Sequence, residues 1–318
     1  ALVDTCAVVK GLPNLVLTRV PRVGGETLLS IFREAVPKDL VKVLTELDAE
    51  DAVHRALALH HEQQQAQHHV RSAGPSGGAT QQQEAEAHAV VLLHEENAQR
   101  ELCQLWTTGG AHIFFTHLAM LDCMPFVQRQ PHWVGLVRHP VDQWISTQYA
   151  VHHCICQTHD SWCANISIPV QLTREAYCEG TLNDLFVAIQ PTLNPLPMNV
   201  QTLYFGGHHP QCDQSRMGSQ CLELALYNMQ KLFAWVGVLE ELELSLKVLR
   251  VTMPDLFAGL DPTSAAKTHK NEHDRTVHLT DLLPEYRELL TKYLRYDLAL
   301  YERAKEFLLK KAGACGFL

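Results

Sequence analysis

The sequence predicts an α/β fold in which a parallel, doubly wound sheet is flanked by helices. Short apolar runs rich in branched residues alternate with segments of helical periodicity, a pattern typical of parallel strands joined by crossover helices. Of the 318 residues, 46% are hydrophobic and 19% are charged, which is enough apolar material for one large core. We therefore expect a single domain over residues 1–318.

The first predicted strand covers residues 14–20 and lies between Pro13 and Pro21. A glycine-containing turn follows, and residues 27–35 have the apolar spacing of a helix. A strand, a glycine turn and a helix in this order present backbone N–H groups to a phosphate. The pattern is common, and it is not a Walker A loop because Gly-Lys-Ser/Thr is missing.

Residues 50–100 differ from the rest of the chain. Two glutamine runs, 63–65 and 81–83, flank the Gly- and Ser-containing stretch 73–78. Such low complexity predicts a flexible insertion outside the core. Its histidines are expected to be solvated rather than bound to metal.

The core pattern resumes after this insertion. The predicted elements that remain are strands at 112–118 and 133–138, a helix at 141–150, a loop-rich region at 151–221, a helix at 222–232, a strand at 234–238, a helix at 240–251 and one long amphipathic helix at 282–308. Pro254 ends the helix at 240–251 because proline cannot continue a helix.

The ten cysteines lie mostly in segments expected to be loops. Such clustering favours disulfides and a secretory compartment, and ordinary free cysteines in a cytosolic protein are the alternative. Asn165-Ile166-Ser167 is a glycosylation sequon that agrees with secretion. A zinc module on Cys154, Cys156, His159 and Cys163 is a further hypothesis, although its spacing is not that of standard zinc knuckles.

The formal net charge is −9 with histidine neutral. An acidic average surface repels polyanions, so we predict no nucleic-acid partner, and a polyanionic ligand would need a local basic patch. No run of about 18 apolar residues is present, which predicts no membrane span. The chain begins with Ala1 rather than Met, so we expect a truncated or processed chain from which a membrane anchor is absent.

Two further positions carry candidate chemistry. Arg138 ends a predicted strand, and Ser146 follows it in the next helix, so both can reach one phosphate. His117 ends another strand, and histidine has a pKa suited to a general base. Taken singly, a surface salt bridge for Arg138 and a structural role for His117 are the more common outcomes.

Together these motifs follow the order and approximate spacing of one enzyme family. The upstream motifs are Arg19-Val20-Pro21-Arg22-Val23-Gly24-Gly25, His117-Leu118, and Arg138-His139-Pro140 with Ser146. The downstream motifs are Tyr204-Phe205-Gly206-Gly207-His208-His209-Pro210-Gln211-Cys212 and Trp235-Val236-Gly237-Val238-Leu239-Glu240-Glu241-Leu242-Glu243. On these residues the sequence resembles the heparan sulfate 2-O / uronyl 2-O-sulfotransferase family, over residues 14–308 without 50–100.

The resemblance implies a P-loop-like sulfotransferase fold and a 3′-phosphoadenosine 5′-phosphosulfate donor. The loop that holds the 5′-phosphosulfate would be formed by Arg22, Val23, Gly24, Gly25, Glu26 and Thr27. Arg138 and Ser146 would hold the 3′-phosphate, and Lys267 and Lys270 would lie near the nucleotide. No metal is expected.

The resemblance also assigns the acceptor side. His117 would be the general base that deprotonates the 2-hydroxyl of a uronic acid, and Arg22 would stabilise charge on the leaving phosphate. Arg19 would join His117 in binding the acceptor. The implied acceptor is a glycosaminoglycan, heparan or dermatan/chondroitin sulfate, and the implied location is the Golgi lumen. Family members are type II membrane proteins and trimers, so a homotrimer is implied.

Several positions depart from the family pattern. Glu26 places a carboxylate beside an anion site, Gly25 replaces a small hydroxyl residue and Phe115 replaces a second histidine. Gly206 replaces a cysteine of a short disulfide loop, so Cys212 either pairs with Cys221 or stays free. The changes at Gly25, Glu26 and Phe115, together with Arg22 in place of the family's loop lysine, support an alternative, a catalytically weak or inactive relative that binds nucleotide or glycan.

Overall fold

The structure is a computed structural model of the whole chain. It describes residues 6–9, 14–18, 20, 23, 25–36, 42–44, 99–100, 103–104, 106–107, 112–116, 120–128, 131–158, 173–180, 183, 198–207, 209–212, 218–268 and 282–318. The predicted flexible insertion at 50–100 lies outside these residues, apart from its last two, and the single domain over 1–318 stays a prediction.

Five parallel strands form the central sheet, in the order β2-β3-β1-β4-β5. The strands are β1 (Leu15–Thr18), β2 (Lys42–Leu44), β3 (His112–Thr116), β4 (His132–Val137) and β5 (Phe233–Val238). The predicted α/β class with a parallel sheet is therefore confirmed. The sequence does not predict β2, because three residues are too few to show a periodic pattern.

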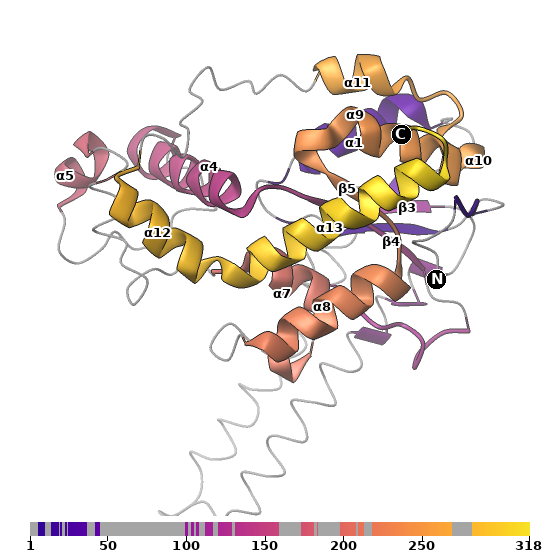
Figure 1. Ribbon diagram of the computed structural model, residues 1–318, viewed down its shortest axis with the longest axis horizontal. Helices are drawn as coiled ribbons and strands as arrows, with labels where there is room; N and C mark the ends of the chain where they lie inside the picture. The colour runs from indigo at the N-terminus through magenta and orange to yellow at the C-terminus, as the bar shows by residue number, and fades with distance from the viewer. Residues whose placement is uncertain are drawn as a thin grey trace, which may run out of the picture.

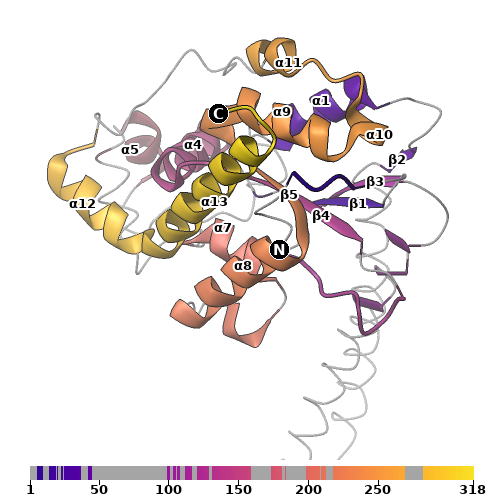
Figure 2. The same cartoon turned by 45° about the vertical axis from the view of Figure 1, so that its right-hand side comes forward.

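Helices cover both faces of this sheet. Figures 1 and 2 show α1 (Gly25–Ala35), α9 (Leu242–Thr252) and α10 (Pro254–Phe257) on one side, and α7 (Val200–Gly206) and α8 (Ser219–Lys231) on the other. The long helix α13 (Arg295–Ala314) packs against edge strand β5. Lys311 of α13 donates a hydrogen bond to the carbonyl of Ala234 in β5 (3.2 Å), so this edge is covered.

The main core lies between the sheet and these helices. All four residues of β1 are buried, and Trp106 packs edge-on against Trp133 with ring centroids 5.4 Å apart. Phe205 of α7 stacks on Phe233 of β5 at 4.6 Å. The continuous apolar pattern of the predicted strands is explained by burial on both sheet faces.

A second apolar cluster lies beside the main core. It joins α4 (Pro140–His153) to α12 (Pro284–Tyr293) through Trp144, Ile145, Leu290 and Leu294. Helix α4 directly follows β4, so this cluster fixes the helix that leaves the carboxyl end of that strand.

The predicted single helix at 282–308 is wrong. The chain forms two helices, α12 and α13, which are separated at Leu294 (φ −90°, ψ 17°). The side chain of Asn199 accepts hydrogen bonds from the backbone N–H groups of Tyr296 and Asp297 (both 3.1 Å) and donates to the carbonyl of Tyr293 (2.8 Å). A distant side chain therefore replaces the helical hydrogen bonds that the break removes.

The predicted loop-rich region at 151–221 is only partly loop. Helix α4 continues to His153 and into a π-helical turn, η1 (Cys154–Thr158). Further helical segments are α5 (Arg174–Glu179), α7 and η3 (Pro210–Cys212). These segments are short, and their apolar residues face several different neighbours, so they give little periodic signal.

Disulfides connect many of the cysteines, as the sequence predicted. Pairs form between Cys6 and Cys315, Cys103 and Cys123, Cys156 and Cys178, and Cys212 and Cys221. Cys154 is also disulfide-bonded, so the zinc hypothesis on Cys154 and Cys156 is wrong, because a zinc ligand must be a free thiolate. Within the described ranges, no three His, Cys, Asp or Glu residues are grouped as a metal site requires.

Among the residues that the structure describes, no helix combines the length and the apolar character needed to cross a bilayer.

Candidate functional site

The candidate site lies where strands β1 and β4 end side by side. These strands are parallel neighbours, with Thr18 level with Gly135. The chain leaves β1 toward β2 on one half of the sheet and leaves β4 toward β5 on the other half. Open α/β sheets bind ligands at such a switch point, beyond the carboxyl ends of the strands.

On the β1 side, a buried turn leads into helix α1. Val20 and Val23 are each 1% exposed, and the N–H of Val23 points to the carbonyl of Val20 (3.4 Å). Helix α1 begins at Gly25 and is anchored by buried Leu28 and Phe32. The first N–H groups of an α-helix have no partner within the helix, and together with the helix dipole they favour an anion.

On the β4 side, Arg138 directly follows the last residue of the strand. The side-chain amide of Gln201 holds both of its backbone groups: the Arg138 N–H donates to Gln201 Oε1 (3.0 Å), and Gln201 Nε2 donates to the Arg138 carbonyl (2.9 Å). The next N–H, that of His139, donates to Glu240 Oε1 (2.8 Å). Side chains from α7 and from η4 (Leu239–Glu241) thus fix the backbone at the end of β4.

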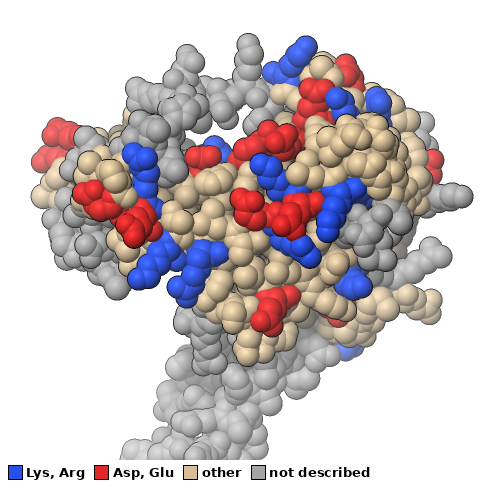
Figure 3. All heavy atoms as spheres, in the orientation of Figure 1, with Lys and Arg blue, Asp and Glu red and all other residues tan. Residues whose placement is uncertain are grey.

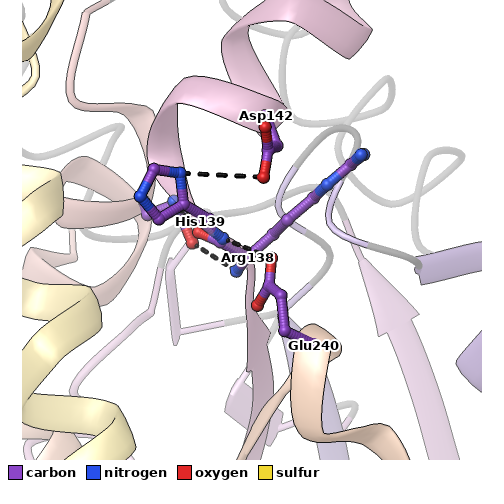
Figure 4. Close-up of polar contacts among 5 residues, drawn as sticks. Arg138, His139, Asp142 and Glu240 are labelled. Atoms are coloured by element: carbon purple, nitrogen blue, oxygen red, sulfur yellow. Dashed lines mark hydrogen bonds and ion pairs between the residues drawn. The ribbon is translucent and has the colours of Figure 1, made fainter. Parts of the chain in front are cut away.

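The charge of Arg138 is balanced by its neighbours. Burial lowers the pKa of the Arg138 guanidinium, and the carboxylates of Asp142 and Glu240 oppose this shift. Arginine remains protonated in proteins even so. Figure 4 shows the Arg138 side chain extending away from Glu240, with Asp142 on the nearby turn of α4. An anion that binds Arg138 therefore also meets two negative charges, which weakens its attraction.

His139 points away from Arg138, toward helix α13. Its Nδ1 lies 3.7 Å from Asp142 Oδ2, and its ring packs edge-on against Tyr301 with centroids 5.4 Å apart. Burial, and next the nearby Glu240 carboxylate, raise the pKa of Tyr301 above its usual value. The side chains of Arg138 and His139 extend in opposite directions (Figure 4), so the two residues face different parts of the molecule.

The predicted site residues divide into two groups. Val23, Gly25–Thr27, Arg138 and Ser146 all follow β1 or β4 at the switch point, with Ser146 half-buried on α4. Lys267 is exposed near the end of α11 (Pro262–Thr268), where its charge acts on Glu243 of α9. The predicted residues that lie outside the described residues are Arg19, Arg22, Gly24, His117 and Lys270.

Strand β3 provides the connection to His117. Thr116, its last residue, is level with Thr18 of β1. In sequence, His117 is therefore the residue directly after β3, and β3 neighbours β1 on the side away from β4.

The 204–212 segment attaches the chain after β3 to helix α7. Gly206 ends α7 against the Cys212–Cys221 disulfide, which resolves the open pairing of Cys212. Gly207 follows in a left-handed conformation (φ 80°), with the Met120 carbonyl where a side chain would start. Met120 also donates its N–H to the Tyr204 carbonyl (2.9 Å). The chain that leaves β3 is therefore held beside α7, the helix that carries Gln201.

Sequence reasoning missed the side chains that hold Arg138 in place. Gln201 and Glu240 lie 63 and 101 residues from their hydrogen-bond partners. Glu240 belongs to the segment 235–243, which resembles the family, but that resemblance indicates no partner. Gln201 gives no signal, because the segment before Tyr204 shows no regular pattern.

Comparison with known proteins gives several relatives and no match to a family model. Human "Uronyl 2-sulfotransferase" is 27% identical over 218 residues, 66% of this chain and 51% of the relative. Chicken "Heparan sulfate 2-O-sulfotransferase 1" is 26% identical over 172 residues, 54% and 44% of the two chains. Drosophila "Heparin sulfate O-sulfotransferase" is 25% identical over 176 residues, 55% and 47%. The chain spans about half the length of these curated relatives.

Proposed function

Because this chain is a relative of the uronyl and heparan sulfate 2-O-sulfotransferases, we propose that it is a glycosaminoglycan sulfotransferase. The donor is 3′-phosphoadenosine 5′-phosphosulfate, and the acceptor is the 2-hydroxyl of a uronic acid in heparan or dermatan/chondroitin sulfate. The proposal includes the P-loop-like sulfotransferase fold for this chain. The site would lie in the Golgi lumen, and the protein would act as a homotrimer.

One observation carries the proposal: the β1–α1 turn and Arg138 flank a single switch point. The donor has two anionic ends, so it needs two anion-binding elements. We assign the 5′-phosphosulfate to Arg22 and the turn from Val23 to Thr27, where the N-terminus of α1 offers N–H groups. We assign the 3′-phosphate to Arg138 and Ser146, with Lys267 and Lys270 nearby.

The reaction moves one sulfuryl group and one proton. His117 takes the proton from the acceptor 2-hydroxyl as its oxygen forms a bond to sulfur. The bond between sulfur and the donor phosphate oxygen breaks, and Arg22 balances the negative charge that develops on that oxygen. Arg19 orients the acceptor beside His117. The products are the 2-O-sulfated uronic acid and adenosine 3′,5′-bisphosphate.

The acceptor is a polyanion, whereas the chain carries a net charge of −9. Figure 3 shows that Lys and Arg alternate with Asp and Glu on one face of the molecule, and the described residues of that face form no continuous basic patch. Glycan binding by this proposal therefore depends on a few local cations, and it should weaken steeply with salt.

The direct test is sulfuryl transfer with radiolabelled donor and purified protein. Heparan sulfate and dermatan sulfate, each chemically 2-O-desulfated, serve as acceptors, and product disaccharides are separated to locate the label. We expect label at the 2-position of uronic acid. Folded protein that transfers no label to any of these acceptors would contradict the proposal.

The base assignment has its own test. We expect His117→Ala to reduce kcat at least about a hundredfold, the usual contribution of a general base, with little change in donor binding. The control is His112→Ala, which removes a histidine from the start of the strand that leads to His117, and we expect it to retain most of the activity. Full activity in His117→Ala would refute the assignment.

A second candidate function is nucleotide binding without turnover. The departures from the family pattern at Glu26 in α1 and Phe115 in β3 favour it, because they lie beside positions assigned to catalysis, whereas Arg138 and Ser146 are kept for the 3′-phosphate. Calorimetric titration with adenosine 3′,5′-bisphosphate separates the two functions. Tight binding without transfer supports the second, and binding with transfer supports the first.

A further inference from the structure

We propose that Gln201 is a positioning residue for the 3′-phosphate of the donor, acting through the backbone of Arg138. This inference rests on the proposed function, because it assigns a task to a residue that supports the same site. Gln201 is itself fully buried, so its effect on a nucleotide has to pass through Arg138.

The first argument is the geometry of the contact. Arg138 lies one residue beyond β4, which ends at Val137, so the sheet ladder of β4 ends just before it. Gln201 uses its amide oxygen as an acceptor and one N–H of its Nε2 as a donor on the two backbone groups of Arg138. Its amide therefore replaces the peptide of a neighbouring strand. The backbone of Arg138 fixes the direction in which its long side chain leaves the sheet.

The second argument is that Gln201 is itself held firmly. Asp297, which is 1% exposed, accepts hydrogen bonds from the N–H of Gln201 (Oδ2, 3.1 Å) and from the N–H of Thr202 (Oδ1, 2.6 Å). A carboxylate at this position caps the first turn of α7. Asn199 completes the arrangement by accepting from the N–H of Asp297. Helix α13 therefore anchors the residue that holds Arg138.

A comparison within α7 separates positioning from simple packing. Asn228, also a buried amide, donates to the carbonyls of Phe205 and Gly206 at the other end of α7 (2.9 and 3.2 Å). It stabilises the same helix, at the end away from Gln201 and Arg138. Loss of Asn228 should therefore reduce stability alone, whereas loss of Gln201 should also change how Arg138 meets a phosphate.

The experiment measures the binding of two nucleotides to the full chain by calorimetry. Adenosine 3′,5′-bisphosphate carries the 3′-phosphate and adenosine 5′-monophosphate lacks it. Gln201→Met keeps the length of the side chain and removes both hydrogen bonds. We expect it to weaken bisphosphate binding about tenfold and to leave monophosphate binding unchanged. In an Arg138→Ala background the same change should have no further effect, because the two residues act as one unit.

Asn228→Ala is the matched control. We expect it to lower the melting temperature while the ratio of the two dissociation constants stays as in wild type. If Gln201→Met does not fold, Gln201→Asn is measured in the same way, since it keeps a neutral amide and is one methylene too short to reach both backbone groups of Arg138.

The outcomes are distinguishable. An equal loss for both nucleotides, or no loss for either, overturns the positioning role, and so does a full additional effect in the Arg138→Ala background. Wild-type protein that binds neither nucleotide overturns the proposed function and this inference with it. Wild-type binding with an unaffected Gln201 variant overturns the inference alone.

Discussion

Gly206 leaves no space for a side chain, although the family pattern has a cysteine at its position. A Cβ atom there would lie 2.3 Å from Cys212 Sγ and 2.8 Å from Cys221 Sγ. Real Cβ atoms do not approach sulfur so closely, so a larger residue must displace the disulfide. The departure from the family pattern is therefore coupled to the Cys212–Cys221 pairing.

We expect Gly206→Ala to lower the free energy of unfolding by about 1–3 kcal/mol, the usual cost of overpacking a core. Gly313→Ala is the matched control: a Cβ atom placed there meets nothing within 4 Å beyond its chain neighbours and its own helix backbone, and the residue lies in α13. For this control we expect the free energy of unfolding to rise by about 0.5–1 kcal/mol, because alanine is more favourable than glycine inside a helix. Urea unfolding under non-reducing conditions measures both. Equal effects of the two changes would contradict the packing argument.

Glu240 has two opposed effects on the proposed donor site. Its carboxylate holds the N–H of His139, and its charge also acts on Arg138 and Tyr301. Glutamine has the same shape and retains an acceptor oxygen for the His139 N–H. The substitution therefore removes the charge while keeping the hydrogen bond.

We expect Glu240→Gln to tighten binding of adenosine 3′,5′-bisphosphate about fivefold at low salt, since one nearby charge is worth ~1 kcal/mol in a watery environment. The gain should shrink as salt is raised. Glu306→Gln is the control: it makes the same change in net charge, but Glu306 pairs with Arg303 within α13. Calorimetry at two salt concentrations measures both. Weaker binding by Glu240→Gln would refute this account.

At the scale of elements, α7 and α13 cap each other. Asp297 of α13 accepts from the first N–H groups of α7, while Asn199, just before α7, accepts from the first N–H groups of α13. Asn199 adopts a left-handed conformation (φ 57°, ψ 44°) to reach them, which asparagine tolerates better than most residues. The start of each helix thus depends on the other helix. The break at Leu294 is therefore held in place by contacts between α7 and α13.

Asp297 also makes stability depend on pH. Burial raises its pKa from 3.8 to about 6, although its hydrogen bonds from Thr202 and Gln201 act in the opposite direction. Between about pH 4 and pH 6 the folded protein therefore holds a proton there that the unfolded chain releases. This contribution to stability is fully present below about pH 4 and is lost as pH rises through about 6.

We expect the unfolding free energy of wild type, relative to Asp297→Asn, to fall by up to about 3 kcal/mol between pH 4 and pH 7, at ~1.4 kcal/mol per pKa unit. Urea unfolding of both proteins across this range measures it. A difference that rises with pH, or stays constant, would contradict the raised pKa.

At the scale of the whole molecule, one disulfide joins the two ends of the described chain. Cys6 and Cys315 are 309 residues apart in sequence. Nearby, the N–H of Val9 donates to the carbonyl of Thr252, the last residue of α9 (2.8 Å). The disulfide therefore fastens the N-terminal segment to the C-terminal end of α13. Since it closes a very long loop, it restricts the unfolded chain more than a short disulfide does.

We expect the double variant Cys6→Ala, Cys315→Ala to lower the free energy of unfolding by about 2–5 kcal/mol. The comparison is Cys156→Ala with Cys178→Ala, whose sequence separation is 22 residues, and we expect a smaller loss there. Urea unfolding under non-reducing conditions measures both double variants. A larger loss for the short loop would show that loop length does not decide the effect.

Sequence alone predicted the strands β1, β3, β4 and β5 and most of the helices that follow them. It also placed Arg138 at a strand end and a helix after the glycine turn, and the structure begins that helix two residues earlier, at Gly25. These features depend on hydrophobic periodicity, proline and glycine, which act over a few residues. Resemblance to the family added the roles of His117 and Arg22, which remain predictions.

The sequence by itself therefore determined the fold class, the disulfide-bonded character and the relationship to the 2-O-sulfotransferases. Only the tertiary structure decided the strand order β2-β3-β1-β4-β5, the break at Leu294 and the contacts of Gln201, Glu240 and Asp297. The physical reason is the separation along the sequence between the residues that interact. Each of these contacts joins residues 63–101 positions apart, and such pairings are set by how whole elements pack, which no local pattern encodes.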